Sequence, residues 1–231
     1  MKRFLVILIF LINLSFFSIA AGDRVRSVEI DCSILPNGDV AVHELWDIDV
    51  NSGTEWYLVK NWPWISQFKV LDGEQTLQDD GKWNTNRSLE QKAGRYGIME
   101  KDGAVKELCW GVGNYGDHLF HVHYVMERFL SSHLDYDMIR FLFIDSDIKP
   151  EQIKVTIHSE VASLNWINTR VWTRGRPVSS LEEDGSVVIT SILPSDQSLH
   201  LMIRFDKGLF NPDRYEYSFF NDYLRNFLLN L

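Results

Sequence analysis

Two histidines, His121 and His123, have the spacing best suited to chemistry in this sequence. They lie two residues apart in a run that alternates like a β-strand, so their imidazoles share one face and could bind one metal ion. His118, His43 or an acidic side chain could supply a third ligand. A closed zinc site needs three or four ligands, and the spacing places only two. We therefore expect these histidines to point to water, with the apolar residues between them in the core, and we expect no cofactor.

Several carboxylates lie close together in the sequence, but none has a spacing that demonstrates a catalytic pair. Glu44, Asp47 and Asp49 fall within one predicted strand, whereas glycoside hydrolysis needs two carboxyls about 5–10 Å apart across a cleft. The acidic segment 145–151 resembles a calcium loop, yet it has no glycine for the sharp turn and is expected to be a plain acidic turn. The sequence also contains no nucleophile elbow, zinc-protease motif, phosphate-binding glycine loop or dinucleotide fingerprint. It therefore predicts a protein without catalytic residues, which is not an enzyme.

Tryptophans are the other side chains that could recognise a ligand. Trp62 and Trp64 flank a rigid proline, and Trp83 lies in a polar, turn-rich segment. Exposed together, the three indoles would form a stacking platform for sugars or for a peptide. The alternative is that they pack in the core and in hairpins. The sequence leaves both interpretations open.

Cys32 and Cys109 are the two cysteines of the chain. In an oxidising compartment they could form a disulfide if the fold brings their Cα atoms within about 7 Å of each other. The alternative is two separate buried thiols, because the alternation of the predicted strands does not clearly place both side chains inside. Cys32 lies on an apolar strand face, where a thiol is usually inert.

The first 21 residues have the features of a secretion signal. Lys2 and Arg3 form a charged start, and residues 4–19 form an apolar run. The small residues Ser18 and Ala20 flank the expected cleavage point, which follows position 20 or 21. The apolar run has sixteen residues, fewer than the ~20 that span a bilayer comfortably, so retention as an uncleaved anchor is the second choice. We expect the mature protein outside the cytoplasm, either periplasmic, secreted or outward-facing at the membrane.

Composition excludes one class of partner and supports a folded domain. The chain has 23 Lys and Arg against 32 Asp and Glu, and without the first 21 residues the balance is 21 bases against 32 acids. A nucleic-acid partner is not expected, because phosphate binding requires a basic face. With 45% hydrophobic residues, the 231-residue chain can bury one full core.

Behind the leader, short runs of alternating apolar residues are separated by turn residues, a pattern typical of an all-β fold. The clearest case is a hairpin in which strands 28–34 and 40–50 flank a Pro-Asn-Gly-Asp turn at 36–39. So many strands exceed one small sheet, and we predict a two-layer antiparallel β-sandwich, immunoglobulin-like in general architecture, over residues 22–210. Segment 75–94 is polar and predicts a long surface loop that carries Trp83. The other predicted strands are 55–60, 68–71, 96–100, 105–112, 119–129, 139–144, 153–158, 170–172, 187–189 and 199–205.

The end of the sequence predicts a different element. Asn211, Pro212 and Asp213 form a helix-start signal, and aromatic or leucine residues recur at every fourth position from Tyr215 to Leu231. We therefore expect an amphipathic helix over residues 211–231. Its wide apolar stripe is expected to pack against the β domain, and binding to a membrane surface is the alternative.

Several longer runs resemble a known family. The run SVEIDCSILPNGDVAVHELWDIDV is similar to that family's opening hairpin, with an acidic residue at Glu44, and YLVKNWPW is similar to its segment with a proline before the next strand. LFHVHYVMERFL resembles its aromatic-rich strand, which ends in a tyrosine, here Tyr124, and LDYDMIRFLFI resembles its acidic-then-apolar strand. IKVTIHSE and the segment 175–177 complete the order. From about Val25 to Phe210, the sequence resembles the N-terminal, extracytoplasmic part of the bacterial predicted membrane proteins with domain of unknown function 2207.

The resemblance implies an all-β domain outside the cytoplasm, in a family whose role is not established, and it carries over no functional residues. In that family, transmembrane helices and a cytoplasmic tail usually follow the β domain, whereas this sequence ends at Leu231. We expect a non-enzymatic binding or interaction module of the bacterial cell envelope, whose partner is another envelope protein or a surface polysaccharide. The alternatives are a carbohydrate-active or metal-dependent hydrolase, and a structural module that associates with the membrane through a signal anchor or the C-terminal helix.

Overall fold

The computed structural model describes residues 22–101, 103–145, 147–176, 178–191, 198–221 and 225. The expected leader, residues 1–21, lies outside the described residues. Strands form most of the described chain, together with a short helix, α1 (Leu89–Lys92). Within these ranges, we find no helix with the length and apolar character needed to cross a bilayer.

The largest sheet has eight strands, in the order β14-β15-β12-β1-β2-β9-β4-β5. Most neighbours in it are antiparallel, but β1 and β12 run parallel, so the sheet is mixed. Its strands are β1 (Arg24–Ile34), β2 (Val40–Val50), β4 (Ile65–Asp72), β5 (Gln75–Thr76), β9 (Gly116–Met126), β12 (Gln152–Ser159), β14 (Ser179–Glu183) and β15 (Ser186–Ser191).

Two smaller sheets contain the remaining strands. One has five strands in the order β13-β16-β11-β10-β17, and the other has four in the order β3-β8-β7-β6. The strands of the first are β13 (Thr169–Gly175), β16 (Leu199–Asp206), β11 (Tyr136–Ile144), β10 (Ser131–Ser132) and β17 (Arg214–Tyr215). Those of the second are β3 (Glu55–Asn61), β8 (Val105–Gly111), β7 (Arg95–Glu100) and β6 (Gln78–Lys82).

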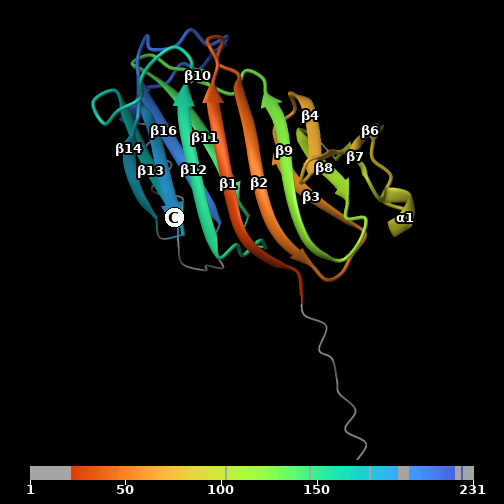
Figure 1. Cartoon of the computed structure of the whole chain (residues 1–231). Coiled ribbons are helices and arrows are strands. Elements are labelled where there is room, and N and C mark those ends of the chain that lie inside the picture. Colours follow the sequence, from red (N-terminus) through yellow and green to blue (C-terminus); the bar gives the residue numbers. More distant parts are fainter. Residues whose placement is uncertain are drawn as a thin grey trace, which may run out of the picture.

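The three sheets share one hydrophobic core. In β2 every second residue from Val40 to Val50 is buried, because successive side chains of a strand point to opposite faces. The same apolar cluster contains Trp46 of the large sheet, Leu108 of the four-stranded sheet and Phe205 of the five-stranded sheet. Figure 1 shows β12, β1, β2 and β9 side by side in the large sheet, with strands of the five-stranded sheet toward the left and those of the four-stranded sheet toward the right.

The prediction of a nearly all-β domain is confirmed, and the predicted strands have counterparts in the structure. The strands form three sheets rather than two, and the pairing is not wholly antiparallel. Within the described chain, three pairs of strands are parallel, β6 with β7, β10 with β17, and β1 with β12, and the last brings Ser27 next to Gln152. Hairpin patterns in a sequence report local pairing, and they do not predict such a long-range partner.

Segment 75–94 is not the long surface loop that its polar composition predicts. It contains β5, β6 and α1. The helix begins at a capping box, in which the Ser88 hydroxyl accepts from the Gln91 N–H and the Gln91 side chain accepts from the Ser88 N–H. Folding of this segment buries Trp83, which is only 4% exposed.

The predicted terminal helix is wrong for residues 211–219. Arg214 and Tyr215 form β17, which pairs in parallel with β10. Pro212 packs closely against Gly38, where an added Cβ would lie 2.7 Å from the Pro212 Cβ. Strand pairing and this contact hold the segment extended despite its helix-start signal. Residues 220, 221 and 225 are helical, and the rest of the predicted helix lies outside the described residues.

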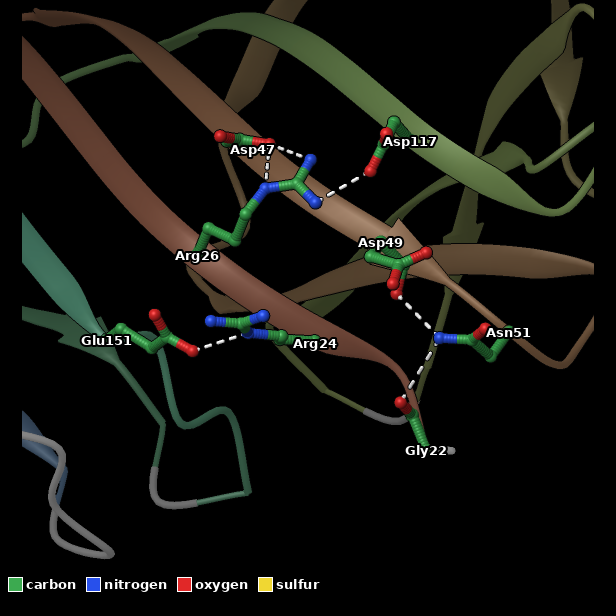
Figure 2. Close-up of polar contacts among 8 residues, drawn as sticks. All are labelled: Gly22, Arg24, Arg26, Asp47, Asp49, Asn51, Asp117 and Glu151. Atoms are coloured by element: carbon green, nitrogen blue, oxygen red, sulfur yellow. Dashed lines mark hydrogen bonds and ion pairs between the residues drawn. The ribbon is translucent and has the colours of Figure 1, made fainter. Parts of the chain in front are cut away.

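A β-bulge organises the beginning of β1. The register between β1 and β2 shifts between Val25 and Ser27, so Arg26 is the bulged residue. The bulge directs Arg26 to two acids on neighbouring strands, because its guanidinium donates to Asp47 at 2.8 Å and to Asp117 at 2.6 Å (Figure 2). These hydrogen bonds raise the pKa of Arg26 above its ordinary value.

Candidate functional site

Two strand edges of the smaller sheets border one groove. Among the described strands, β3 is an end strand with only β8 beside it. β11 has β16 along one side, whereas β10 on the other side pairs only with Met138 and Asp137. In the part of the chain that the structure describes, residues 141–144 of β11 therefore have no strand neighbour on that side. Since β3 and β11 line the same cavities, we call the space between them the β3–β11 groove.

The β3–β11 groove consists of two adjoining cavities, of about 310 and 520 Å³. The first is lined by residues 55–60 and by the C-terminal end of β11, and the second by the end of β3 and the middle of β11. Val59, Lys60, Leu142 and Asp145 line both cavities, so the groove is continuous. The start of β3 lies opposite the end of β11, so the two strands run antiparallel across the groove.

Strand alternation determines which main-chain groups of β3 face the groove. The C=O of Thr54 accepts from the N–H of Val112, on the β8 side. Successive residues of a strand direct their main-chain groups to opposite sides. Tyr57 and Val59 therefore direct their N–H and C=O groups away from β8 and toward the groove.

The same reasoning applies to β11. The C=O of Tyr136 accepts from the N–H of His133, on the β10 side. Leu142, an even number of residues further along, directs its main chain to that side as well. Its side chain is 37% exposed, and those of Tyr57 and Val59 are each 50% exposed. The exposed side chains nearest these main-chain groups are thus apolar.

A buried polar network around Glu44 forms the floor of the groove. Glu44 is fully buried and Lys60 is 5% exposed. The Glu44 carboxylate accepts hydrogen bonds from Lys60 Nζ at 2.8 Å, from Tyr124 Oη at 2.5 Å and from Trp46 Nε1 at 2.9 Å. Burial and the Glu44 carboxylate raise the pKa of Tyr124 well above its ordinary value, so Tyr124 remains a hydrogen-bond donor. The carboxylate and its three donors satisfy one another beneath the groove.

The groove is acidic at the end where β3 begins. The first cavity is lined by four acidic residues: Asp23, Glu55, Asp145 and Asp147. Among the described residues that line this cavity, the one basic residue is Lys60, which is already paired with Glu44, and Glu55 pairs with Lys92.

Two arginines close to this end bond to acids that do not line the cavity. Arg24 donates to Glu151 at 2.6 Å, and Arg26 bonds to Asp47 and Asp117 (Figure 2). These arginines therefore satisfy other carboxylates and do not pair with those that line the groove.

Trp62 and Trp64 lie together at the opposite end, with their rings edge to face at 5.5 Å. Trp62 lines the second cavity and donates from Nε1 to the C=O of Glu127 at 3.0 Å. The guanidinium of Arg214 lies 5.0 Å from the centre of the Trp62 ring. Trp64 is 44% exposed, and the guanidinium of Arg128 lies 5.1 Å from its ring centre. One face of each indole is thus occupied by an arginine.

Trp83 does not join Trp62 and Trp64. It is buried, and its Nε1 donates to Glu55, which is also paired with Lys92 at 3.1 Å. The predicted three-tryptophan platform is therefore wrong for Trp83, because the segment that carries it folds into β6 and α1 instead of a loop.

His121 and His123 share one face, as their spacing predicts, and the register of β2 with β9 adds His43. The rings of His43 and His123 stack at 4.2 Å, and His43 Nε2 lies 3.1 Å from His121 Nδ1. Burial lowers the pKa of His123 to about 4 and also lowers that of His43. The rings are parallel, and among the described residues no three His, Cys, Asp or Glu side chains are grouped to hold a metal ion. His118 lies apart and contacts Asp72 at 2.7 Å.

Cys32 and Cys109 are both buried and free, so the disulfide that the sequence left open is not formed. They belong to different sheets: Cys32 pairs with Val42 in the large sheet, and Cys109 pairs with Tyr57 in the four-stranded sheet. Burial raises the pKa of both thiols, that of Cys109 to about 12. Both are therefore protonated at neutral pH and poor nucleophiles.

The carboxylates of β2 lie on two faces of the strand, and Asp49 shares the face of Asp47. Glu44 faces the core, whereas Asp47 lies on the opposite face with Arg26. The sequence analysis missed Lys60 and Tyr124 as partners of Glu44. The alternation of side chains along β2 and β3 could have shown that Glu44 and Lys60 point inward. It could not have shown that the two side chains form an ion pair.

Comparison with known proteins identifies a family. Residues 24–205 match the family model described as "Predicted membrane protein (DUF2207) N-terminal domain". No curated protein matches the sequence.

Among solved structures, the chain resembles parts of larger proteins. Yeast LTA4 hydrolase in complex with bestatin is 8% identical with a TM-score of 0.50, over 78% of this chain and 28% of that one. A putative protease from Parabacteroides distasonis is 14% identical with a TM-score of 0.47, over 81% of this chain and 41% of that one. A putative nutrient binding protein from Legionella pneumophila is 10% identical with a TM-score of 0.43, over 79% of this chain and 67% of that one. The chain spans less than half the length of the protease and the hydrolase, and the likeness to the hydrolase shows a shared fold alone.

Proposed function

The chain belongs to the family of predicted membrane proteins defined by the DUF2207 N-terminal domain, and we propose that it is an extracytoplasmic binding module without catalysis of its own. Its partner, another envelope component, binds in the β3–β11 groove. The secretion signal that the first 21 residues predict supports the location outside the cytoplasm.

One observation carries this proposal: exposed apolar side chains and outward main-chain groups coincide along the groove. Tyr57, Val59 and Leu142 are exposed there, and the same residues direct their main chain toward it. Apolar surface beside main-chain groups without a strand partner is typical of an interaction site.

We also propose that the three sheets are arranged in two layers. The two smaller sheets act as one layer opposite the large sheet, which makes the domain a β-sandwich of general immunoglobulin-like type. The β3–β11 groove is then an interruption of the second layer. Two observations support this description. β3 and β11 both contribute side chains to the one core, as strands of one layer would. They are not hydrogen-bonded to each other, as expected where the layer is interrupted.

Site-specific photocrosslinking tests the proposed function. A photoreactive phenylalanine analogue replaces Tyr57 in the groove, or Leu119 on β9 as the control, in bacterial cells that export the full chain. Leu119 is 41% exposed, comparable to Tyr57. We expect light-dependent adducts with an envelope component at position 57 and none at position 119. Equal labelling at both positions, or no adduct at position 57, would contradict a partner in the groove.

A further inference from the structure

We infer that the β3–β11 groove binds an extended polypeptide segment of another protein, which forms a new strand between β3 and β11 through main-chain hydrogen bonds. This inference rests on the proposed function, because it names the chemical class of partner for the same groove.

The main chain on both walls is arranged for strand addition. Tyr57 and Val59 on one wall and Leu142 on the other direct N–H and C=O groups into the groove, as the alternation from Thr54 and Tyr136 requires. A row of such groups is a ready template for another strand. An inserted segment would bond on both sides and join the two smaller sheets into one. Since β3 and β11 are antiparallel to each other, the segment would run parallel to one and antiparallel to the other.

The edge at β3 differs from the other described sheet edges. Proteins protect edge strands by charge or by shortness. β6, the opposite edge of the same sheet, has the sequence Gln-Asp-Asp-Gly-Lys, and β13 carries two arginines. β14 has the sequence Ser-Ser-Leu-Glu-Glu, and β5 and β17 have two residues each. β3 has seven residues, and the exposed side chains in its middle, Tyr57 and Val59, are apolar, so it is a long edge with an apolar centre.

The lining of the groove defines the chemistry of the segment. Its length should be about seven residues, as in β3. Between Tyr57 and Leu142 it would carry alternating apolar or β-branched side chains, which form favourable cross-strand pairs. At the end lined by Asp23 and Asp147 it would carry a lysine or arginine, whose charge is complementary to these two carboxylates.

A polysaccharide fits the groove less well. Sugars bind to open aromatic faces, and here Arg214 lies over Trp62 and Arg128 over Trp64. Between the two ends the first cavity is lined by Tyr57, by aliphatic side chains and by three further aromatic residues, of which Trp46 and Phe143 are buried and Trp56 is half-buried. These observations favour a peptide strand.

The test uses random heptapeptides displayed on phage and selected on the purified full chain. We expect enriched peptides that alternate β-branched or aromatic residues and that carry a basic residue at one end. Their binding is then measured by fluorescence anisotropy with wild-type chain, Val59→Pro and Val59→Ala. Proline removes the outward N–H of Val59, so we expect affinity to fall by about tenfold or more, whereas alanine keeps the N–H and should cost less than about threefold.

Two controls keep the test decisive. Proline is tolerated where the N–H does not belong to the ladder, and thermal unfolding will show whether Val59→Pro is folded. If it is not, the selected peptide is N-methylated at alternating residues and measured with the wild-type chain. Because the segment would bond to β3 through one set of alternate residues and to β11 through the other, either N-methylated register should bind about tenfold more weakly.

Three results would overturn the inference: no enriched heptapeptide, equal affinities for folded Val59→Pro and Val59→Ala, or full binding by either N-methylated register. If adducts still form at position 57 in the photocrosslinking experiment, the proposed binding function survives and only the strand-addition mode fails. Competition for that adduct by oligosaccharides, and not by heptapeptides, would assign the groove to a polysaccharide instead.

Discussion

The buried ion pair of Glu44 and Lys60 is the residue-scale feature on which the floor of the groove depends. Lys60→Met leaves the carboxylate buried without its cation, which should lower the free energy of unfolding by about 3–5 kcal/mol. Adding Glu44→Gln should recover at least part of this loss, because a neutral amide can accept from Trp46 Nε1 through its oxygen while its NH2 donates to the Tyr124 hydroxyl. Urea unfolding of the wild type, the single variant and the double variant measures both effects. A loss below about 1 kcal/mol for Lys60→Met, the size of an exposed pair, would contradict a buried pair.

The histidine stack predicts a particular pH dependence of stability. The pKa of His123 is lowered to about 4 in the folded chain from an ordinary 6.5, first by burial and then by the charges of His43 and His121. Between these values the unfolded chain binds a proton that the folded chain does not. The contribution of His123 to stability is therefore complete above pH 6.5 and is lost as the pH falls toward 4. Chemical unfolding across this range should show a smaller decline for His123→Gln than for the wild type, and identical slopes would contradict the prediction.

The two cysteines should behave as inaccessible thiols. Because both are buried and their pKa values are raised, a thiol reagent at pH 8 should label neither Cys32 nor Cys109 in the folded chain. In denaturant without reductant it should label both. Intact mass and thiol titration of the exported protein measure this, and a denatured chain without reactive thiols would demonstrate a disulfide.

From the sequence, the face on which a side chain lies could be predicted within a strand, but its partners on other strands could not. The inward direction of Glu44 follows from its parity with Val42 and Trp46. That Lys60 lies beside it depends on how the four-stranded sheet packs on the large one. Similarly, the shared face of His121 and His123 was predictable, whereas His43 joins them through the register of β2 with β9.

At the scale of elements, period-two alternation predicted the strands well, because most strands bury one face. It failed for segment 75–94, where short polar strands have no apolar alternation. The capping box of Ser88 and Gln91 was a readable signal for α1 in that segment. The helix prediction failed at residues 211–219, because pairing of β17 with β10 overrides the local helix signal.

The packing of α1 on β8 gives an element-scale prediction. A Cβ at Gly111 would lie 2.0 Å from the C=O oxygen of Lys92, so the helix would have to shift. Lys92 is buried there, with Nζ bonded to Thr54 and to the C=O of Thr85, each at 2.8 Å. Gly111→Ala should lower the free energy of unfolding by about 1–3 kcal/mol.

Gly22→Ala is the matched control for Gly111→Ala, since nothing lies within 4 Å of its added Cβ. It should leave the unfolding midpoint unchanged. Equal midpoints for the wild type and both variants would show that α1 does not approach β8 this closely.

At the scale of the whole molecule, the sequence predicted a single β-rich unit but not its arrangement. The parallel partner of β1 lies far along the chain in β12, and the strands between them distribute over all three sheets. The β3–β11 groove results from this distribution, since its walls belong to different sheets. No local pattern could have predicted it.

Amide hydrogen exchange, followed by NMR with and without a selected heptapeptide, tests the central claim most directly. In the unbound chain, the outward amides of Tyr57, Val59 and Leu142 should exchange rapidly, whereas the neighbouring amide of Leu58, which faces β8, should be protected. Bound peptide should slow exchange at these three outward amides by about tenfold or more, as expected for new main-chain hydrogen bonds. Unchanged exchange at all three under saturating peptide would contradict strand addition between β3 and β11.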